Sequence, residues 1–507
     1  MPVRCLVRSG AYFDSVVLMR IAAEIGGRDG VRTASLVMAT ASNKDVLATA
    51  GLLEGAAADA GPNDLVVAVD GAEEALDDAL AAAEEALSAK GAPAATGGAG
   101  EPRLPRTLAE AAGPDDEERG GLAVISTPGR YAAAEARKAL RLGLNAFVFS
   151  DNVPLEQEIA LKREAHERGL IVMGPDCGTG IVGGVPLGFA NEVRAGDIGL
   201  IGASGTGLQQ VSSLIDGWGA GVSQVIGVGS HDLGAAVGAI SMLDALDALA
   251  ADPATKVLGL VSKPPDAEVA ERVLGRAAAS GKPVVAAFLG ADPEGAPDGV
   301  RMAATLEEAA RLLVAASTGE DPPAASETPD LAASRGPRRL LRGLYAGGTF
   351  AYEAGLLLAP RLGEPSDEAS PPTGDRDAVL PDAHLVLDLG ADRFTVGRPH
   401  PMIDPAVRLD MLRAAGADPR TAVIVLDVVL GHLAAEDPAG DLAPVIAEIT
   451  ARDDAPHVVC FVVGTDSDPQ DRRRQERTLR DAGAVLAGSS SAAAALAETL
   501  IPTEVAA

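Results

Sequence analysis

Residues 197–214 read D-I-G-L-I-G-A-S-G-T-G-L-Q-Q-V-S-S-L, and residues 340–358 read L-L-R-G-L-Y-A-G-G-T-F-A-Y-E-A-G-L-L-L. In both stretches an apolar run ends in a turn of small residues, Ser204-Gly205-Thr206 or Gly347-Gly348-Thr349, after which helix-forming residues begin. This pattern predicts a strand, a tight turn and a helix. The free amides and the positive dipole end of a helix start attract anions, so two starts facing one another would bind a phosphate between them. Either turn alone is equally compatible with an ordinary capped helix.

The composition predicts an α/β protein of several domains. A chain of 507 residues has room for about three domains, each with its own core. Apolar residues make up 47% of the sequence and aromatic residues only 3%, so Ala, Val, Leu and Ile fill the cores, as is typical of α/β layers. The net charge of -30 argues against nucleic acid or an anionic membrane as the main partner, because both would be repelled.

The cysteines and the N-terminus indicate a cytoplasmic protein. Cys5, Cys177 and Cys460 lie far apart and form no C-x-x-C motif, so neither a disulfide framework nor a metal site is expected. The first ten residues lack the basic and then apolar pattern of a signal peptide, and no apolar run approaches the roughly 18 residues of a membrane span.

Alternating apolar and helical patterns divide the chain into four folded segments and two linkers. We expect a small N-terminal α/β sandwich, a linker rich in Gly, Pro and Ala, a Rossmann-like domain, a flavodoxin-like domain with a parallel sheet, a second linker and a second flavodoxin-like domain. Their expected bounds are 1–90, 91–120, 121–195, 196–316, 317–337 and 338–507.

Polar residues in the last segment form candidate sites. In R-P-H-P-M-I-D-P, prolines stiffen a loop that carries Arg398, His400 and Asp404; a guanidinium there could bind a carboxylate or phosphate, and the imidazole could transfer a proton. A loop pinned by its own internal bonds is the alternative. Asp427 ends an apolar strand, where ligands of open α/β sheets bind, or else it caps the turn at Gly431.

Two further groups are candidates for substrate binding. Thr465, Asp468 and Gln470 follow the apolar run 458–463 and either line the same sheet edge or cap a helix. His231, followed by Asp232, comes just after a strand that ends near residue 228; an exposed histidine of this kind is often incidental. Cys177 lies in a turn and is expected to be a small buried residue without thiol chemistry.

Several motifs resemble those of the succinyl-CoA synthetase-like, NDP-forming acyl-CoA synthetases, and most closely the FdrA-like proteins among them. The motifs are I-S-T-P-G-R-Y (125–131), M-G-P-D-C-G-T-G-I (173–181), Tyr12-Phe13-Asp14-Ser15, G-R-P-H-P-M-I-D-P (397–405) and G-T-D-S-D-P-Q (464–470). The resemblance implies that 121–195 is a CoA-binding-type domain, and that 196–316 and 338–507 are ligase domains of the α-subunit and β-subunit types. It also implies that the two helix starts face one another across one phosphate.

The sequence departs from the synthetase pattern at the groups that carry its chemistry. The loop that holds the phosphorylated histidine in the family corresponds to residues 290–302, and no histidine lies between His231 and His384. Lys263 stands where the family has a supporting glutamate, and a cation there favours a free phosphate; a solvated loop lysine is the alternative. The Gly-rich CoA loop, a segment of about 200 residues for a nucleotide-binding ATP-grasp fold and a P-loop are all missing. Phosphate is therefore expected as a substrate, and CoA or nucleotide binding by this chain alone is not expected.

The resemblance to FdrA-like proteins implies a subunit of oxamate carbamoyltransferase, acting with two other subunits in purine and allantoin breakdown. Oxalurate and phosphate would give oxamate and carbamoyl phosphate, with the helix starts and Lys263 binding phosphate, Arg398 binding the carboxylate and His400 assisting the departing nitrogen. Two alternatives remain open: an acyl-CoA ligase completed by a nucleotide-binding partner, and a non-catalytic scaffold. Partner subunits, with self-association as a further option, and small-molecule substrates are expected under the first reading.

Overall fold

The computed structural model describes residues 2–11, 13, 15–90, 105–113, 121–292, 295–334, 338–371, 378–395 and 399–502. The chain forms two compact units: residues 1–104 with 391–404, and residues 105–390 with 405–507.

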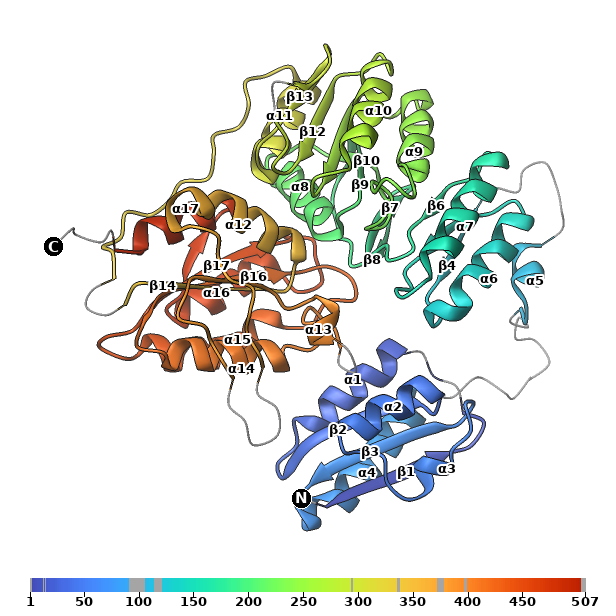
Figure 1. Ribbon diagram of the computed structural model, residues 1–507, viewed down its shortest axis with the longest axis vertical. Helices are drawn as coiled ribbons and strands as arrows, with labels where there is room; N and C mark the ends of the chain where they lie inside the picture. The colour runs from blue at the N-terminus through green and yellow to red at the C-terminus, as the bar shows by residue number, and fades with distance from the viewer. Residues whose placement is uncertain are drawn as a thin grey trace. The chain divides into compact units, whose positions relative to one another are not determined.

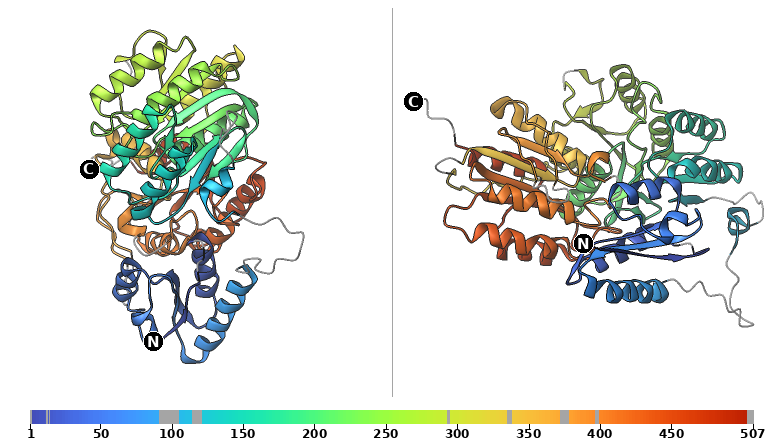
Figure 2. Two further views of the ribbon diagram at one scale, coloured as in Figure 1. Left: turned by 90° about the vertical axis from the view of Figure 1, so that its right-hand side faces the viewer. Right: turned by 60° about the horizontal axis from the view of Figure 1, so that its bottom comes forward.

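The first unit contains the predicted small α/β sandwich. A three-stranded antiparallel sheet of order β1-β3-β2 lies between α1 and α4 on one face and α2 on the other (Figure 2). Ile21 and Leu76 fill one core and Leu47 the other. The elements are β1 (Val3–Arg8), α1 (Ser15–Gly26), β2 (Val31–Met38), α2 (Ala41–Thr49), α3 (Ala56–Asp59), β3 (Leu65–Gly71), α4 (Glu73–Lys90) and, from the second part of this unit, α13 (Asp392–Thr395).

The second unit begins with the Rossmann-like domain. Its three strands are parallel in the order β4-β5-β6, and the core between sheet and helices is built from small and branched residues such as Ala136 and Leu161. The elements are α5 (Leu108–Ala112), β4 (Leu122–Ile125), α6 (Gly129–Arg141), β5 (Asn145–Val148), α7 (Leu155–Glu167) and β6 (Val172–Met173).

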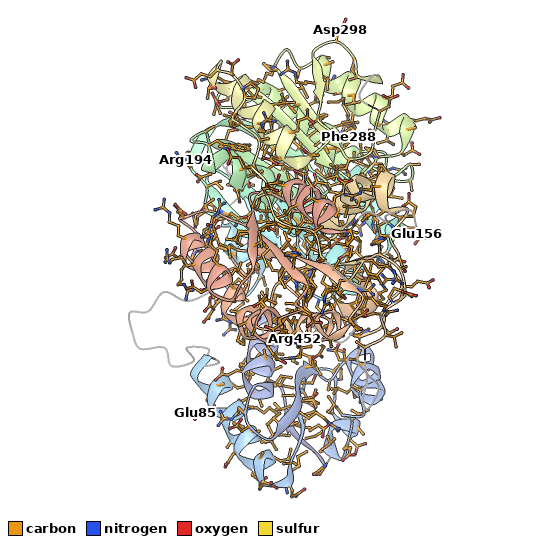
Figure 3. All side chains as sticks on the ribbon, turned by 90° about the vertical axis from the view of Figure 1, so that its left-hand side faces the viewer. Glu85, Glu156, Arg194, Phe288, Asp298 and Arg452 are labelled. Carbon is orange, nitrogen blue, oxygen red and sulfur yellow. The ribbon has the colours of Figure 1, made fainter. Side chains whose placement is uncertain are left out.

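A seven-stranded sheet of order β13-β12-β11-β9-β10-β7-β8 forms the first flavodoxin-like domain. Helices α8 and α11 cover one face and α9 and α10 the other (Figure 1). Figure 3 shows Phe288 among the side chains inside this domain and Asp298 at its surface. The elements are β7 (Thr179–Val182), β8 (Val185–Gly188), β9 (Ala195–Gly202), α8 (Gly205–Gly217), β10 (Val222–Gly227), α9 (Ile240–Ala251), β11 (Val257–Ser262), α10 (Ala267–Ala278), β12 (Val284–Phe288), β13 (Val300–Met302) and α11 (Leu306–Thr318).

The hairpin of β7 and β8 belongs to this sheet, although its residues precede the domain boundary expected near residue 195. Val225 of β10 pairs antiparallel with Ile181 of β7, whereas β9 to β13 are parallel to one another. The Rossmann-like segment therefore supplies one edge of the next domain's sheet.

The second flavodoxin-like domain has a parallel sheet of order β15-β14-β16-β17-β18. Helices α12 and α17 lie on one face, and α14, α15 and α16 on the other (Figure 1). The elements are β14 (Leu340–Tyr345), α12 (Gly348–Leu362), β15 (Leu385–Asp388), α14 (Ala406–Ala417), β16 (Thr421–Val429), α15 (Pro438–Thr450), β17 (His457–Val463), α16 (Arg472–Asp481), β18 (Val485–Ala487) and α17 (Ser490–Leu500).

Helices α8 and α11 of one flavodoxin-like domain pack against α12 and α17 of the other. The interface contains buried polar groups that satisfy one another: Gln210 Nε2 donates to Ser490 Oγ over 2.8 Å, and Glu353 accepts from the Leu306 amide over 2.8 Å. The segment between the domains contains no helix or strand over residues 321–334, yet its Ser334 hydroxyl donates to the Ala422 carbonyl over 2.9 Å. The two flavodoxin-like domains are thus joined by packed helices and by a connecting segment that is hydrogen-bonded to the second domain.

Candidate functional site

The first helix start follows the central strand β9. Ser204 caps α8, and its Oγ accepts a hydrogen bond from the Gly207 amide over 3.0 Å. Gly205 has no room for a side chain without close contact, since a Cβ there would lie 3.2 Å from Thr179 Oγ1 on the β7 hairpin. Residues Gly178 and Thr179 therefore lie close to this turn.

A buried carboxylate, that of Asp427, binds the backbone of the second helix start. Asp427 accepts from the amides of Ala346 and Gly347 over 2.8 and 2.9 Å, and it forms an ion pair of 2.6 Å with the buried Arg408. Asp427 was expected to face a ligand at the sheet edge. The structure instead buries it completely: β16 continues to Val429, and both carboxylate oxygens of Asp427 bind the turn amides and the guanidinium.

The two helix starts meet. Ser204 Oγ lies 2.5 Å from Thr349 Oγ1, and a Cβ on Gly347 would lie 3.0 Å from Thr206 Cγ2. Hydroxyls and amides from both domains thus converge at one point, which we call the paired helix starts (Ser204–Thr206 and Gly347–Thr349).

A pocket opens at the α8 start. It is lined by Asp176, Cys177, Gly178, Thr179, Gly202, Ala203, Ser204, Gly205, Gly227 and Gly229. The Cys177 thiol is buried, and burial raises its pKa to about 12, so it stays protonated at neutral pH, as the expectation of no thiol chemistry requires. The pocket is therefore lined by backbone groups and by the polar side chains of Ser204, Thr179 and Asp176.

A second carboxylate lies beside the α12 start. A Cβ on Gly348 would lie 2.2 Å from Asp388 Oδ2, and Asp388 Oδ1 accepts from the Gly390 amide over 3.0 Å. Asp388 was not among the candidates, although it ends β15 at the carboxyl edge of the sheet, where ligands of open α/β folds bind. Each helix start therefore has a carboxylate near it: Asp176 in the pocket at the α8 start and Asp388 at the α12 start.

Lys263 is exposed after β11, and its Nζ lies 6.0 Å from the centre of the Tyr352 ring on α12. Gly290, where the loop corresponding to the family's histidine loop begins, also lies against α12, since a Cβ there would be 3.6 Å from Tyr352 Oη. The residues that follow β11 and β12 in the first flavodoxin-like domain therefore lie near α12 of the second.

Thr465, Asp468 and Gln470 are buried and hold segments of the second unit together. Asp468 accepts from the Asn191 side chain and the Glu192 amide, each over 2.8 Å, and Gln470 Nε2 donates to the Gly431 carbonyl over 2.8 Å. Burial raises the pKa of Asp468. These residues were expected to line the sheet edge for a substrate, and the structure gives each of them protein partners.

The R-P-H-P loop belongs to the first unit. The His400 ring accepts from the Met402 amide over 3.2 Å, and the His400 carbonyl accepts from the amides of Ile403 and Asp404. Arg398 lies outside the described residues, as do Tyr12 and Asp14.

His231 lies on the loop after β10, and its Nδ1 is 3.0 Å from Glu158 Oε2 on α7. Glu158 and its ion-pair partner Lys162 were not singled out from the sequence, where an i,i+4 Glu-Lys pair is typical of an exposed helix face. Both are completely buried here.

Within the described ranges, no helix has the length and apolar character needed to cross a membrane.

Three family models match the chain: "AllF, heavy metal-associated domain" over residues 1–103, "Succinyl-CoA ligase like flavodoxin domain" over 195–320, and "CoA-ligase" over 344–500. "Uncharacterized protein YahF" of Escherichia coli (strain K12) is 40% identical over 520 residues, covering 99% of each chain. The "ADP-forming sulfoacetate-CoA ligase subunit SauD" of Bilophila wadsworthia is 29% identical over 191 residues, 36% of this chain and 62% of that protein. An acetyl-coenzyme A synthetase from Ca. Korarchaeum cryptofilum is similar with a TM-score of 0.32 and 17% identity, covering 75% of this chain and 82% of the other.

The description of the first model raises the question of a heavy metal in the N-terminal unit. Cys5 is the only cysteine in residues 1–103; it lies within β1, and its Sγ is 3.2 Å from the Leu52 carbonyl. Burial raises the pKa of this thiol, which disfavours the thiolate that soft metals require. Among the described residues, no three His, Cys, Asp or Glu side chains are grouped to hold a metal ion. The residues present do not fit such a site.

Proposed function

Because the chain belongs to the FdrA-like family of the succinyl-CoA synthetase-like superfamily, we propose that it is a subunit of an oxamate carbamoyltransferase that binds phosphate at its paired helix starts. The observation that carries the proposal is the contact between the two helix starts, where Ser204 Oγ lies 2.5 Å from Thr349 Oγ1. The loop that corresponds to the family's phosphorylated-histidine loop, residues 290–302, contains no histidine. A site that keeps the anion-binding amides and lacks the relay suits phosphate as a reactant.

In the proposed reaction a phosphate oxygen attacks the carbamoyl carbon of oxalurate. The new bond joins that oxygen to carbon, the bond between carbon and the amide nitrogen breaks, and the proton of the phosphate hydroxyl moves to the departing nitrogen. The products are carbamoyl phosphate and oxamate, so atoms and charge balance without an added oxidant or cofactor. The helix-start amides and Lys263 would hold phosphate and stabilise the charge on the attacking group. Arg398 for the oxamate carboxylate, and His400 with Asp404 for the leaving nitrogen, stay predictions from the sequence, to be tested by substitution.

Calorimetric titration of the full chain in phosphate-free buffer tests the binding part of this proposal. Phosphate and carbamoyl phosphate should each give saturable heat and CoA none. Gly348→Val should abolish phosphate binding, because its side chain would occupy the space next to Asp388 at the α12 start. Gly355→Val is the matched control, since a Cβ at this position of the same helix meets nothing within 4 Å. Equal phosphate affinity in the two variants would refute binding at the paired helix starts.

An acyl-CoA ligase completed by a partner subunit is the second candidate. The matches of residues 195–320 and 344–500 to ligase models favour it, as does the similarity to a sulfoacetate-CoA ligase subunit. CoA binding in the same titration would favour this candidate. Formation of oxalurate and phosphate from oxamate and carbamoyl phosphate, which is the reverse reaction, in the presence of the partner subunits would favour the first. Activity that requires partners but is unaffected by Gly348→Val would indicate the scaffold role.

A further inference from the structure

The imidazole of His231 is oriented by a carboxylate that has no access to solvent. His231 Nδ1 lies 3.0 Å from Glu158 Oε2, while the His231 side chain is 60% exposed and the Glu158 side chain 1% exposed. A fixed acceptor at Nδ1 selects the tautomer in which that nitrogen carries the proton, leaving Nε2 as a base. The exposed part of the ring can therefore exchange a proton with a ligand.

Glu158 is held in place by a buried cluster of charges. Lys162 Nζ lies 2.9 Å from Glu158 Oε1, 2.8 Å from Asp232 Oδ1 and 2.9 Å from the Val228 carbonyl. Asp232 in turn accepts from the amides of Ser241 and Met242, which begin α9. Two carboxylates and one ammonium leave one net negative charge, which a protonated imidazole at the open side of the cluster would offset.

His231 lies two residues after Gly229, which lines the pocket at the α8 start. Gly229 lines that pocket together with Ser204 and Gly205. Ser230 Oγ donates to Asp176 Oδ2 over 2.8 Å, and Asp176 lines the same pocket. Both neighbours of His231 are therefore held in place: Ser230 by its bond to Asp176, and Asp232 by burial.

We propose that His231, oriented by Glu158, carries the proton in the carbamoyl transfer, so that it is a catalytic residue and Glu158 its positioning residue. Nε2 takes the proton from the phosphate hydroxyl as the oxygen attacks carbon, and the imidazolium gives it to the amide nitrogen as the carbon–nitrogen bond breaks. The ring ends the cycle as it began. This assignment rests on the proposed function and replaces His400 as the proton carrier. The charged group in contact with the ring is Glu158, which pairs with Lys162, and Lys162 pairs in turn with Asp232.

The same helix offers a matched control. His166 Nδ1 lies 2.7 Å from Asp244 Oδ1, and its side chain is also mostly exposed. It lies eight residues along α7 from Glu158, about 12 Å at 1.5 Å per residue, and so away from the pocket. A general effect of losing an exposed histidine bound to a carboxylate would appear equally in His166→Gln.

The kinetic test uses the full chain with its partner subunits. We expect His231→Gln to lower kcat about 100-fold, within the usual range for loss of a general acid–base group, and to change KM for phosphate less than about 3-fold. Glu158→Gln should lower kcat and change the shape of the pH–rate profile, because Nδ1 loses its carboxylate. His166→Gln should match the wild type. A His231→Gln enzyme with kcat within about 3-fold of the wild type, or a loss seen only in His400→Gln, would overturn the inference.

Nitrogen-15 NMR of the histidine side chains tests the placement without activity. In the full chain, inorganic phosphate should shift the Nε2 signal of His231, identified by its absence in His231→Gln, and leave that of His166 unchanged. Absence of carbamoyl transfer in the wild type would refute the proposed function, whereas a His231 signal that ignores saturating phosphate would overturn the inference itself.

Discussion

Replacing Asp427 by asparagine tests whether this carboxylate stabilises the turn before α12 or takes part in the reaction. Asp427 is completely buried, pairs with the buried Arg408 at 2.6 Å and accepts from the amides of Ala346 and Gly347. Removing one member of a buried ion pair costs about 3–5 kcal/mol, and a buried amide left without an acceptor about 1–3 kcal/mol. These groups touch one another, so the costs do not add fully. We expect Asp427→Asn to lower the free energy of unfolding by about 4 kcal/mol.

Urea unfolding followed by circular dichroism and by the fluorescence of Trp218, the only tryptophan, measures this loss. Asp466→Asn is the control: Asp466 pairs with Arg473 at 2.8 Å on the surface of the same domain, where an ion pair contributes about 1 kcal/mol or less. Phosphate affinity should fall together with stability in Asp427→Asn, because the turn that starts α12 loses its support. An Asp427→Asn chain that unfolds like the wild type but has lost catalysis would refute this reasoning and restore the reacting role expected from the sequence.

Three further results are expected. Lys162→Met should cost about 3–5 kcal/mol in urea unfolding because it leaves two buried carboxylates side by side, and a loss under about 1 kcal/mol would contradict the buried cluster. Burial raises the pKa of Glu353 from 4.5 to about 7, so the folded chain keeps this proton longer than the unfolded chain. Stability should therefore fall by about 3 kcal/mol as the pH rises from about 4.5 to about 7, and Glu353→Gln, compared with the wild type by urea unfolding across that range, should lose this slope. A double-mutant cycle of Ser204→Ala and Thr349→Ala should give a coupling energy of about 1 kcal/mol; strict additivity would show that the hydroxyls do not interact.

The local patterns predicted the elements and the helix starts well because both depend on neighbouring residues. The turn before α8 is capped by Ser204, as the small-residue pattern indicated, and the apolar run 458–463 lies within β17. Apolar runs bounded by turn residues suffice for parallel strands buried on both faces. The fold class follows from this alternation alone.

The surroundings of each candidate side chain could not be predicted, because they depend on residues that are distant in the sequence. Asp388 ends β15 and lies against the α12 start, whereas Asp427 lies inside β16, two residues before its end, and is buried under a turn. Which of them approaches a ligand depends on where Arg408 of α14 places its guanidinium. Likewise, the buried state of Glu158 and Lys162 results from α7 packing over the loop that carries Asp232.

The contact between Ser204 and Thr349 has a consequence for how the site assembles. The two helix starts lie on one chain and are joined by a connection that is itself hydrogen-bonded to the second domain. Bringing them together is therefore intramolecular, with an effective concentration of the order of millimolar for a short tether. Two ligase domains carried on separate polypeptides come apart on dilution, whereas here the paired helix starts should form equally well at any protein concentration.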